Sequence, residues 1–265
     1  NAWLKHKHSE KLWKINSYFC SMLAAFKHQL KRHFSAWQNK RILLAVSGGL
    51  DSMVLADLCL KSNLNVAIAH CNFKLRAKES DDEEQFVVAF AELHDLIIFS
   101  KQFSTEEFSN QSKLSIQMAA RHLRYDFFEK LRQQHQFDAV FTAHHADDNL
   151  ETFFINLSRG TGIDGLVGIP VKNNYIIRPL LTFTRTEILA YAEENHLKWC
   201  EDSSNASVKY QRNQLRHELI PVLKTIYPSI IDALSTTQAH LDDTQNLLKN
   251  HIQDIEEHVI KSSKS

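Results

Sequence analysis

The stretch Arg41-Ile42-Leu43-Leu44-Ala45-Val46-Ser47-Gly48-Gly49-Leu50-Asp51-Ser52 decides the fold class. Its first half is a continuous apolar run, which is typical of a strand buried on both faces of a parallel sheet. Two adjacent glycines follow, and residues 52–60 then have the composition of a helix. A strand, a glycine turn and a helix in this order indicate the start of a strand–helix–strand unit.

The same alternation continues along the chain. Strands are predicted at residues 65–70, 96–99, 138–142 and 175–178, and helices at 78–94, 114–135, 146–157 and 184–196. This spacing predicts an α/β fold with a doubly wound, mostly parallel sheet, followed by a C-terminal helical segment. We expect three parts: an N-terminal helical extension (1–38), a catalytic domain (39–212) and a helical segment (213–265) that begins a linker or second domain. Residues 230–265 have few apolar positions per turn, so that helix is expected to pack on another segment.

Composition excludes several classes of protein. The 265 residues carry 31 basic and 31 acidic side chains, so any surface for a polyanion has to be a local patch. The four cysteines are scattered without a Cys-x-x-Cys pair, which argues against disulfides, structural zinc and an iron–sulfur centre. No apolar run reaches membrane-spanning length and no signal peptide is evident, so we expect a cytoplasmic protein. The chain does not begin with Met, and Met22 is a candidate natural start.

The glycine loop after the first strand has the features of a phosphate site. Ligands of open α/β sheets bind at the carboxyl ends of the strands, and glycines let the backbone approach an anion at a helix N-terminus. Ser47 and Ser52 add hydroxyl donors, but the Lys of a Walker loop is missing. Asp51 would face the phosphates, which is reasonable only with Mg²⁺ between them. The alternative is an ordinary glycine turn capped by serine.

The segment Ser47-Gly48-Gly49-Leu50-Asp51-Ser52 resembles the signature of the N-type ATP pyrophosphatases, the PP-loop superfamily. The resemblance implies an adenine nucleotide alpha hydrolase-like fold and a nucleotide held by all six residues. It also implies that ATP is cleaved between its α- and β-phosphates, so that AMP is transferred to a substrate oxygen and pyrophosphate leaves.

Six further motifs narrow the resemblance to one family. They are His70 to Arg76, Ala119 to Phe128, Thr142 to Thr152, Arg159 to Leu166, Glu201 to Asn205, and Tyr210 to Arg216. Over residues 41–220 these motifs are similar to those of the tRNA(Ile)-lysidine synthetases, although residues 71–74 depart from the second His and the Gly that the family often has. Family members usually carry further C-terminal domains, so this chain is expected to be a shortened form.

The resemblance implies a specific ligation. Free L-lysine is joined to C2 of the wobble cytidine, position 34, of an isoleucine tRNA with a CAU anticodon. ATP first adenylates the cytidine, and the lysine amine then expels AMP, giving lysidine, AMP and pyrophosphate. The implied ligands are ATP with Mg²⁺, lysine and this tRNA, with no membrane partner.

Candidate catalytic residues follow from the charges in this reaction. Mg²⁺ at Asp51, with Arg121 nearby, would neutralise charge on the α-phosphate. Lysine arrives as an ammonium, so it needs carboxylates for recognition and a base for activation. Asp147 and Asp148 lie four and three residues before Glu151 on one predicted helix, beside His144. Each candidate has an alternative explanation. The acids could be favoured only by the helix dipole, His144 could be a core histidine, and Arg121 could be a solvated surface residue.

Arginines after the sheet are candidates for contacts with tRNA. Arg212, Asn213 and Arg216 fall within one predicted helical turn, where Arg forks suit phosphates or base edges and Asn can read a pyrimidine edge. Arg76 and Arg159 could add phosphate contacts. Each arginine could instead be a solvated surface charge.

Two other functions remain open. A tRNA 2-thiolase of the same superfamily is disfavoured by the scattered cysteines, because thiolation needs paired cysteines or a cluster. A non-catalytic adenine-nucleotide-binding module would not need a carboxylate group that deprotonates an amine. The sequence leaves the oligomeric state open, a homodimer included.

Overall fold

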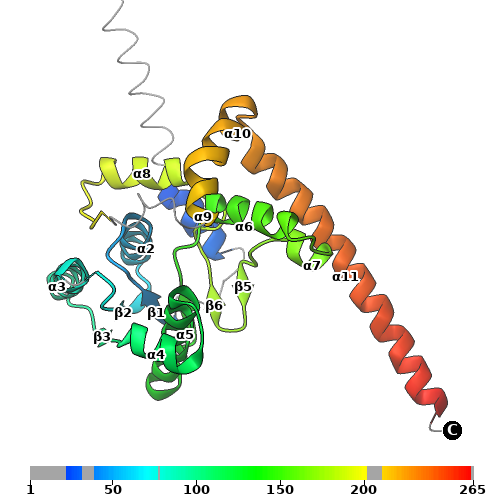
Figure 1. Ribbon diagram of the computed structural model, residues 1–265, viewed down its shortest axis with the longest axis horizontal. Coiled ribbons are helices and arrows are strands. Elements are labelled where there is room, and N and C mark those ends of the chain that lie inside the picture. The colour runs from blue at the N-terminus through cyan, green and yellow to red at the C-terminus, as the bar shows by residue number, and fades with distance from the viewer. Residues whose placement is uncertain (1–21, 32–38, 77, 202–210, 264–265) are drawn as a thin grey trace, which may run out of the picture. The chain divides into compact units, whose positions relative to one another are not determined.

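The computed structural model of the protein describes residues 22–31, 39–76, 78–201 and 211–263. The chain forms two compact units. The first comprises Asn1–His145 and Val171–Asp202, and the second comprises Ala146–Pro170 and Ser203–Ser265. Figure 1 labels most of the helices and strands of both units.

The first unit contains a six-stranded sheet, counted over the described residues, in the order β3-β2-β1-β4-β6-β5 (Figure 1). All neighbouring strands are parallel except β5 and β6, which form an antiparallel edge. The prediction of a mostly parallel sheet is therefore confirmed. The strands are β1 (Arg41–Ala45), β2 (Asn65–Asn72), β3 (Ile98–Gln102), β4 (Ala139–Phe141), β5 (Lys172–Asn173) and β6 (Ile176–Ile177).

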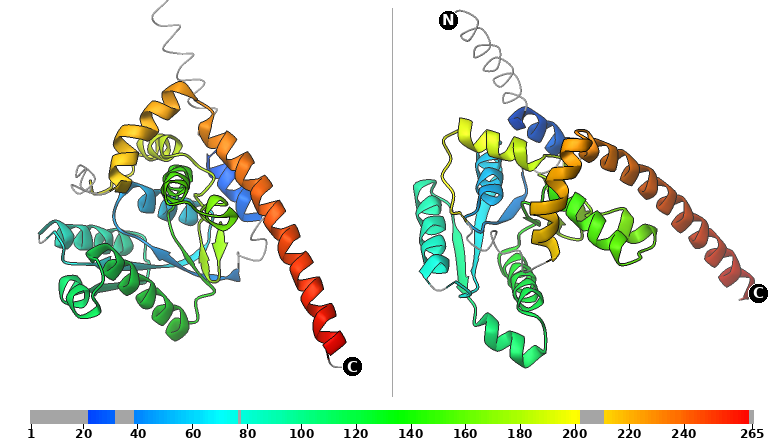
Figure 2. Two further views of the ribbon diagram at one scale, coloured as in Figure 1. Left: turned by 45° about the vertical axis from the view of Figure 1, so that its right-hand side comes forward. Right: turned by 45° about the horizontal axis from the view of Figure 1, so that its top comes forward.

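Helices cover both faces of this sheet, which is why its central strands are apolar throughout. Ile42 and Leu44 of β1 pack in one core with apolar side chains of α2 (Leu50–Lys61), α3 (Lys78–Leu93) and α8 (Arg185–Glu194). Leu43 points to the opposite face and packs against α5 (Ile116–His135). Figure 2 shows the sheet between these helices. A doubly wound sheet follows from this alternation.

Two elements of the first unit were not predicted. The helix α4 (Thr105–Ser112) has one apolar residue among eight, so it offers no hydrophobic periodicity. The strand β5 has only two residues, which is too short for a pattern, whereas β6 lies within the strand predicted at 175–178. Residues 22–31, within the range predicted as an N-terminal helical extension, form a helix whose Phe26 is fully buried in the sheet core.

The second unit is helical over its described residues, as expected for the C-terminal segment. A small core of Leu150, Ile220 and Leu234 holds its helices together. The first half of α11 contacts α6 and α7, and its second half extends beyond them (Figure 2). The elements are α6 (Ala146–Ser158), α7 (Ile163–Leu166), α9 (Gln211–Gln214), a π-helical turn (Leu215–Leu219), α10 (Ile220–Ile226) and α11 (Ile230–Ser263).

Some sequence predictions fall outside the described residues. These are the parts of the N-terminal extension at 1–21 and 32–38, residues Asp202 to Asn205 of one motif, and Tyr210 of another. Among the helices that the structure describes, none has the length and apolar character to cross a membrane.

Candidate functional site

The predicted phosphate loop lies between the end of β1 and the first turn of α2. Gly48 has φ +93°, a conformation that favours glycine. A Cβ atom on Gly48 would lie 3.3 Å from the Val87 side chain, and Cys200 donates a backbone hydrogen bond to its carbonyl at 2.9 Å. Neighbouring elements therefore pack closely on the loop: the backbone angle favours glycine at this position, and a side chain there would have to displace Val87 slightly.

Hydrogen bonds within the loop set its shape before any ligand binds. The Ser52 hydroxyl donates to the Gly49 carbonyl at 2.9 Å and accepts from the Ser47 backbone N–H at 3.2 Å. Gly49 is the N-cap of α2 and has no side chain that could satisfy the first-turn N–H groups. Such N–H groups, with the positive end of the helix dipole, form an anion site. The loop can therefore bind phosphate.

Asp51, in the first turn of α2, contacts an arginine and a histidine that come from elsewhere in the first unit. Arg185 Nη1 donates to its two carboxylate oxygens at 3.2 and 3.0 Å. Nε2 of the buried His145 lies 3.6 Å from Asp51 Oδ2. An acid, a guanidinium and an imidazole thus meet beside the phosphate loop.

His70 lies in β2, beside the start of the loop, and is almost fully buried. Its Nδ1 is 2.9 Å from the carbonyl oxygen of Val46, while its Nε2 has no hydrogen-bond partner among the described residues. Burial lowers the pKa of His70, with the Val46 hydrogen bond and the Glu84 charge acting in the opposite direction. The ring is therefore expected to be neutral at pH 7, with its Nδ1 proton donated to Val46.

The predicted carboxylate cluster lies in the second unit, in the first two turns of α6. Asp147 and Glu151 are buried, and Asp148 is half-buried. Lys224 of α10 places its ammonium on the Asp147 carboxylate. These acids are therefore more than solvated first-turn residues, because cations from a distant part of the chain neutralise them.

Two arginines of the predicted tRNA group pair with the same cluster. Arg212 Nε donates to Glu151 at 2.6 Å and its Nη2 donates to Asp148 at 3.0 Å. Arg216 Nε donates to Glu151 at 2.7 Å and its Nη2 donates to Asp148 at 3.2 Å. Arg212, Asn213 and Arg216 lie on α9 and the π-helical turn that follows it, and Asn213 is half-buried. The candidate amine-binding acids and the candidate tRNA-binding arginines thus form one ion-pair network.

Other predicted residues lie in separate settings. Arg121 is exposed on α5 and lies over the Tyr125 ring at 4.9 Å. His144 Nδ1 is 3.0 Å from the Thr142 hydroxyl. Arg76 makes two hydrogen bonds of 2.8 Å to Glu83, and Arg159 is exposed after α6. Within the described part of the chain, no hydrogen bond or ion pair joins Arg121 to Asp51, so its proposed catalytic role has no geometric support beyond its sequence motif.

Three residues of these clusters escaped the sequence reasoning. His145 stands beside the predicted His144, so the paired histidines were a signal for it. The sequence carries no signal for Arg185 or Lys224, because each is one charged residue of an ordinary helical pattern. Their partners Asp51 and Asp147 are 134 and 77 residues away in the sequence.

The donors at the loop fit Mg²⁺ bound together with a nucleotide. Among the described residues, no group of three or more His, Cys, Asp or Glu side chains could hold a metal ion. Asp51 is a single, partly exposed carboxylate. Mg²⁺ commonly takes one or two carboxylates and completes its shell with phosphate oxygens and water. Asp51 could therefore contribute one ligand to a Mg²⁺ ion held mainly by phosphates.

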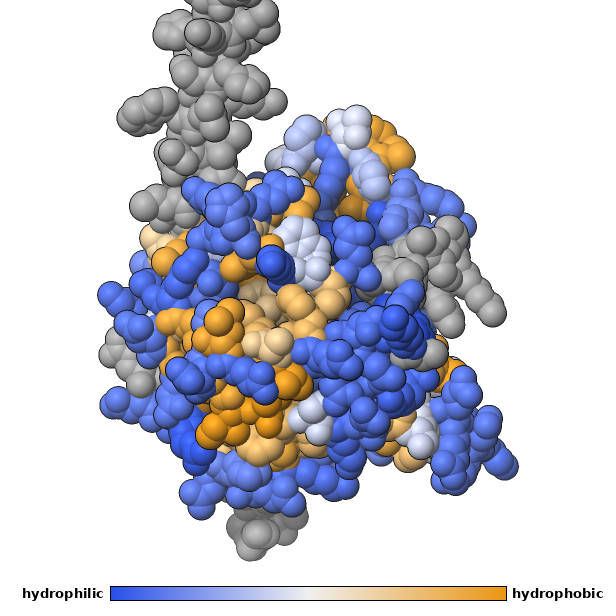
Figure 3. All heavy atoms as spheres, turned by 90° about the vertical axis from the view of Figure 1, so that its left-hand side faces the viewer, coloured by the Kyte–Doolittle hydropathy of each residue, from blue (hydrophilic) through white to orange (hydrophobic). Residues whose placement is uncertain are grey.

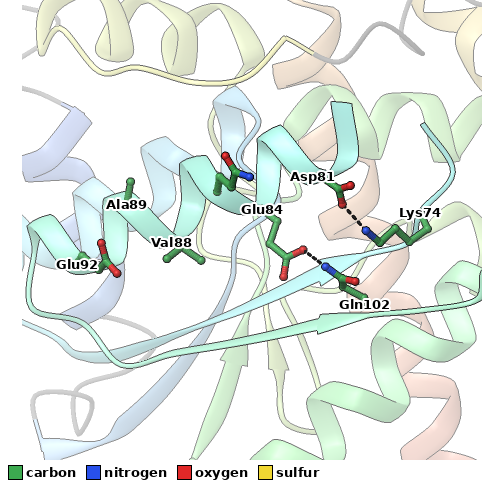
Figure 4. Close-up of a pocket in the computed structure, with 8 residues that line it drawn as sticks. Lys74, Asp81, Glu84, Val88, Ala89, Glu92 and Gln102 are labelled. Atoms are coloured by element: carbon green, nitrogen blue, oxygen red, sulfur yellow. Dashed lines mark hydrogen bonds and ion pairs between the residues drawn. The ribbon is translucent and has the colours of Figure 1, made fainter. Parts of the chain in front are cut away.

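A surface hollow of about 480 Å³ lies along α3 and is distinct from the loop. Four of its polar side chains pair with one another: Lys74 pairs with Asp81, and Gln102 donates to Glu84 at 2.8 Å (Figure 4). On the side of the molecule where α3 lies, a hydrophobic area is surrounded by hydrophilic residues (Figure 3). Nothing in this hollow matches the chemistry of the loop or of the carboxylate cluster.

The chain belongs to the PP-loop domain family, whose model matches residues 22–223. Within that family it is similar to tRNA(Ile)-lysidine synthases. It is 42% identical over 205 residues to the enzyme of Porphyromonas gingivalis, which covers 77% of this chain and 45% of the relative. The enzyme of Chlorobaculum tepidum is 42% identical over 217 residues, which cover 80% of this chain and 65% of the relative. The enzyme of Bacillus subtilis is 35% identical over 248 residues, which cover 91% of this chain and 52% of the relative. The chain spans about half the length of most of these curated relatives.

Solved structures support the fold. The U34-tRNA thiolase NcsA from Methanococcus maripaludis, solved with its [4Fe-4S] cluster, superimposes with a TM-score of 0.68 at 16% identity, covering 82% of this chain and 78% of that one. The NMN synthetase from Francisella tularensis gives 0.53 at 13% identity, with 83% and 93% covered. The expected adenine nucleotide alpha hydrolase-like fold is thereby confirmed.

Proposed function

We propose that this protein joins free L-lysine to C2 of the wobble cytidine, position 34, of an isoleucine tRNA with a CAU anticodon. The observation that carries the proposal is the carboxylate cluster of α6, in a chain that also has a PP-loop. A nucleotide-binding loop alone would suit many reactions. A buried group of acids that already holds an ammonium, that of Lys224, suits a reaction whose nucleophile is an amine.

The first step uses the loop at Ser47 to Ser52. The cytidine O2 attacks the α-phosphorus of ATP, so that an O2–P bond forms, the bond to the β-phosphate oxygen breaks, and pyrophosphate leaves. The loop N–H groups would hold the phosphates. Asp51 would position Mg²⁺, which supplies positive charge to the phosphate oxygens when bound. Arg121, expected from its motif to assist, remains part of this proposal.

The second step uses Asp147, Asp148 and Glu151, with His144 as a further candidate. These acids would bind the lysine ammonium, and one of them or His144 would accept its proton. The amine then attacks C2, a C–N bond forms, the C2–O2 bond breaks, and AMP leaves with the oxygen. Burial of Asp147 and Glu151 strengthens their interaction with an ammonium, because charges attract more strongly where water is excluded.

Recognition of tRNA is proposed for Arg212, Asn213 and Arg216, with Arg76 as an outlying phosphate contact. Two of the arginines already pair with the acids that would bind lysine. An incoming RNA phosphate would compete for the same guanidinium groups, so binding of tRNA would release Glu151 and Asp148 toward the amine. We further propose residues 39–212 as the catalytic domain and 213–265 as the start of a linker or second domain.

A tRNA 2-thiolase is the nearest alternative, and the cysteines disfavour it. The described cysteines form no group that could hold a metal cluster. Burial raises the pKa of Cys59, and it raises that of Cys71 to about 12, so neither has the reactive thiolate that sulfur transfer needs. A nucleotide-binding module without turnover is disfavoured by the buried carboxylates, which binding of ATP does not need.

One assay decides between these functions. Pyrophosphate release from ATP should require an isoleucine tRNA with a CAU anticodon, and labelled lysine should enter that tRNA. A transcript with cytidine 34 changed to uridine is the matched control and should stay unlabelled. Sulfur incorporation without lysine would establish the thiolase. Binding of ATP with no turnover, in the protein extended to the length of its relatives, would establish the binding module.

A further inference from the structure

Arg185 is the first residue of α8, and its guanidinium lies on the carboxylate of the phosphate loop. The two hydrogen bonds to Asp51 measure 3.2 and 3.0 Å. Both side chains are partly exposed, Arg185 at 43% and Asp51 at 27%. The ion pair is therefore accessible from solvent beside the loop, so a ligand bound to the loop could reach it.

Packing between α8 and α2 keeps this arginine at the loop. Tyr191 donates a hydrogen bond of 2.7 Å to Asp57, and Lys61 donates one of 2.6 Å to Asn195. The Arg185–Asp51 pair and these two hydrogen bonds follow one another in the same order along α2 and α8. In each of the three contacts the two residues are 134 positions apart in the sequence. Arg185 is thus held beside Asp51 by the core and by two further contacts, independently of its own ion pair.

The start of α8 is also fixed, and two of its backbone donors are already used. Thr184 and Glu187 form a capping box in which each side chain accepts from the backbone N–H of the other residue. This cap orients the first turn and satisfies N–H groups that could otherwise bind an anion. The Arg185 side chain is the part of α8 that already contacts the loop, through the Asp51 carboxylate.

We propose that Arg185 is a phosphate-binding residue of the nucleotide site, and that its ion pair with Asp51 is the resting state of that site. When Mg²⁺ and ATP bind, Asp51 turns to the metal ion and the Arg185 fork turns to phosphate oxygens. Arg suits this exchange because its planar donors fit carboxylate and phosphate equally well. The inference rests on the proposed function only in requiring that the loop binds ATP.

The alternative is a positioning role, in which Arg185 only holds Asp51 ready for the metal ion. Binding of ATP without metal separates the two roles. If Arg185 touches phosphate, Arg185→Gln should weaken ATP binding in EDTA, where Asp51 has no metal to hold. Asp51→Asn should then tighten metal-free binding, because it removes a negative charge and releases the guanidinium.

The experiment titrates the full chain with ATP in EDTA, and with Mg²⁺ and a nonhydrolysable ATP analogue, following heat of binding. Arg185→Gln should weaken both by about ten- to a hundredfold, the range for loss of a hydrogen bond to a charged group. The ATP affinity of Arg185→Lys should lie between those of Arg185→Gln and the wild type. Arg132→Gln, which removes a comparable ion pair with Glu129 on α5, is the control and should bind as the wild type does.

Each outcome decides one question. Wild-type affinity in Arg185→Gln, with and without metal, overturns the inference and leaves ATP binding intact. Loss of affinity with Mg²⁺ alone gives Arg185 the positioning role and also overturns it. A wild type that binds no ATP under either condition contradicts the proposed function itself. Thermal unfolding of each variant, with Arg185→Lys as the milder change, distinguishes lost binding from lost folding.

Discussion

Lys224 of α10 places its ammonium on the carboxylate of Asp147, in the first turn of α6. The lysine side chain of this protein thus occupies a carboxylate of the cluster that we propose for the lysine substrate. An internal ammonium competes with an external one for the same acid, because it acts as a ligand that is always present at a high effective concentration.

Removing this internal competitor should favour the substrate. We expect Lys224→Met to lower the KM for lysine by about three- to tenfold, corresponding to a modest difference in affinity between two states. The measurement is labelled lysine incorporation over a range of lysine concentrations. Lys130→Met, which removes an exposed ion pair with Asp126 on α5, is the control. An unchanged KM with normal turnover would show that the amine binds at Asp148 or Glu151 instead.

Glu151 should contribute more to stability than an ordinary surface acid. Its side chain is 1% exposed and pairs with two arginines. Glu151→Gln would leave both guanidiniums without their buried counter-charge and should lower the free energy of unfolding by about 3 kcal/mol. Urea unfolding followed by circular dichroism measures this. Glu129→Gln, at a half-exposed pair with Arg132, should cost less than about 1 kcal/mol. Equal losses would mean that the Glu151 network is not structural.

Two aspartates of α2 should separate catalysis from stability. Asp51→Ala should lower pyrophosphate release by at least about a hundredfold, because it removes the acid that faces the phosphates. Asp57→Ala removes the acceptor of the Tyr191 hydrogen bond and should lower the free energy of unfolding by about 1 to 2 kcal/mol, with pyrophosphate release retained. Activity in Asp51→Ala would refute the assignment of the loop.

Arg212 should affect tRNA more than ATP. Arg212→Ala removes a guanidinium that we propose for RNA phosphate, so the Kd for tRNA should rise by about tenfold or more while ATP affinity changes little. Filter binding of tRNA and nucleotide titration measure the two effects. Arg212→Lys keeps the charge without the fork and should give a smaller rise. Equal losses for tRNA and ATP would place Arg212 in the nucleotide site.

Cys71 should be unreactive in the folded protein. Burial raises the pKa of its thiol from 9.0 to about 12, although Arg124 and Lys101 act to lower it. At pH 8 its thiolate fraction should be about a thousandfold below that of the unfolded chain, because each pKa unit is a factor of ten. Mass spectrometry after iodoacetamide treatment, with and without urea, tests this, and rapid labelling of the folded protein would contradict it.

The same shift has a consequence for stability at high pH. The unfolded thiol loses its proton near pH 9, while the folded thiol keeps its proton to about pH 12. The unfolded state therefore binds fewer protons in this window, so the contribution of Cys71 to stability falls as pH rises from about 9 to 12. Cys71→Ser should remove this part of the pH dependence.

The sequence by itself determined the α/β class, the mostly parallel sheet and the position of the phosphate loop. These features depend on local signals. A buried strand must be apolar along its length, as at Ile42 to Leu44, and a positive φ next to a packed helix requires glycine, as at Gly48. The acids of α6 were predicted on one helix for the same reason, since neighbours on a helix face are set by local spacing.

Only the tertiary structure decided which charges meet. Arg185 contacts Asp51 across 134 residues, and Arg212 contacts Glu151 across 61. The periodicity of the sequence does not predict such pairs, because a charged residue of a helix fits the same pattern whether its side chain faces water or a buried acid. Its partner is chosen by how helices pack, and packing depends on apolar side chains spread over the whole unit. The phosphate loop was therefore predictable from the sequence, whereas the arginine that lies on its carboxylate was not.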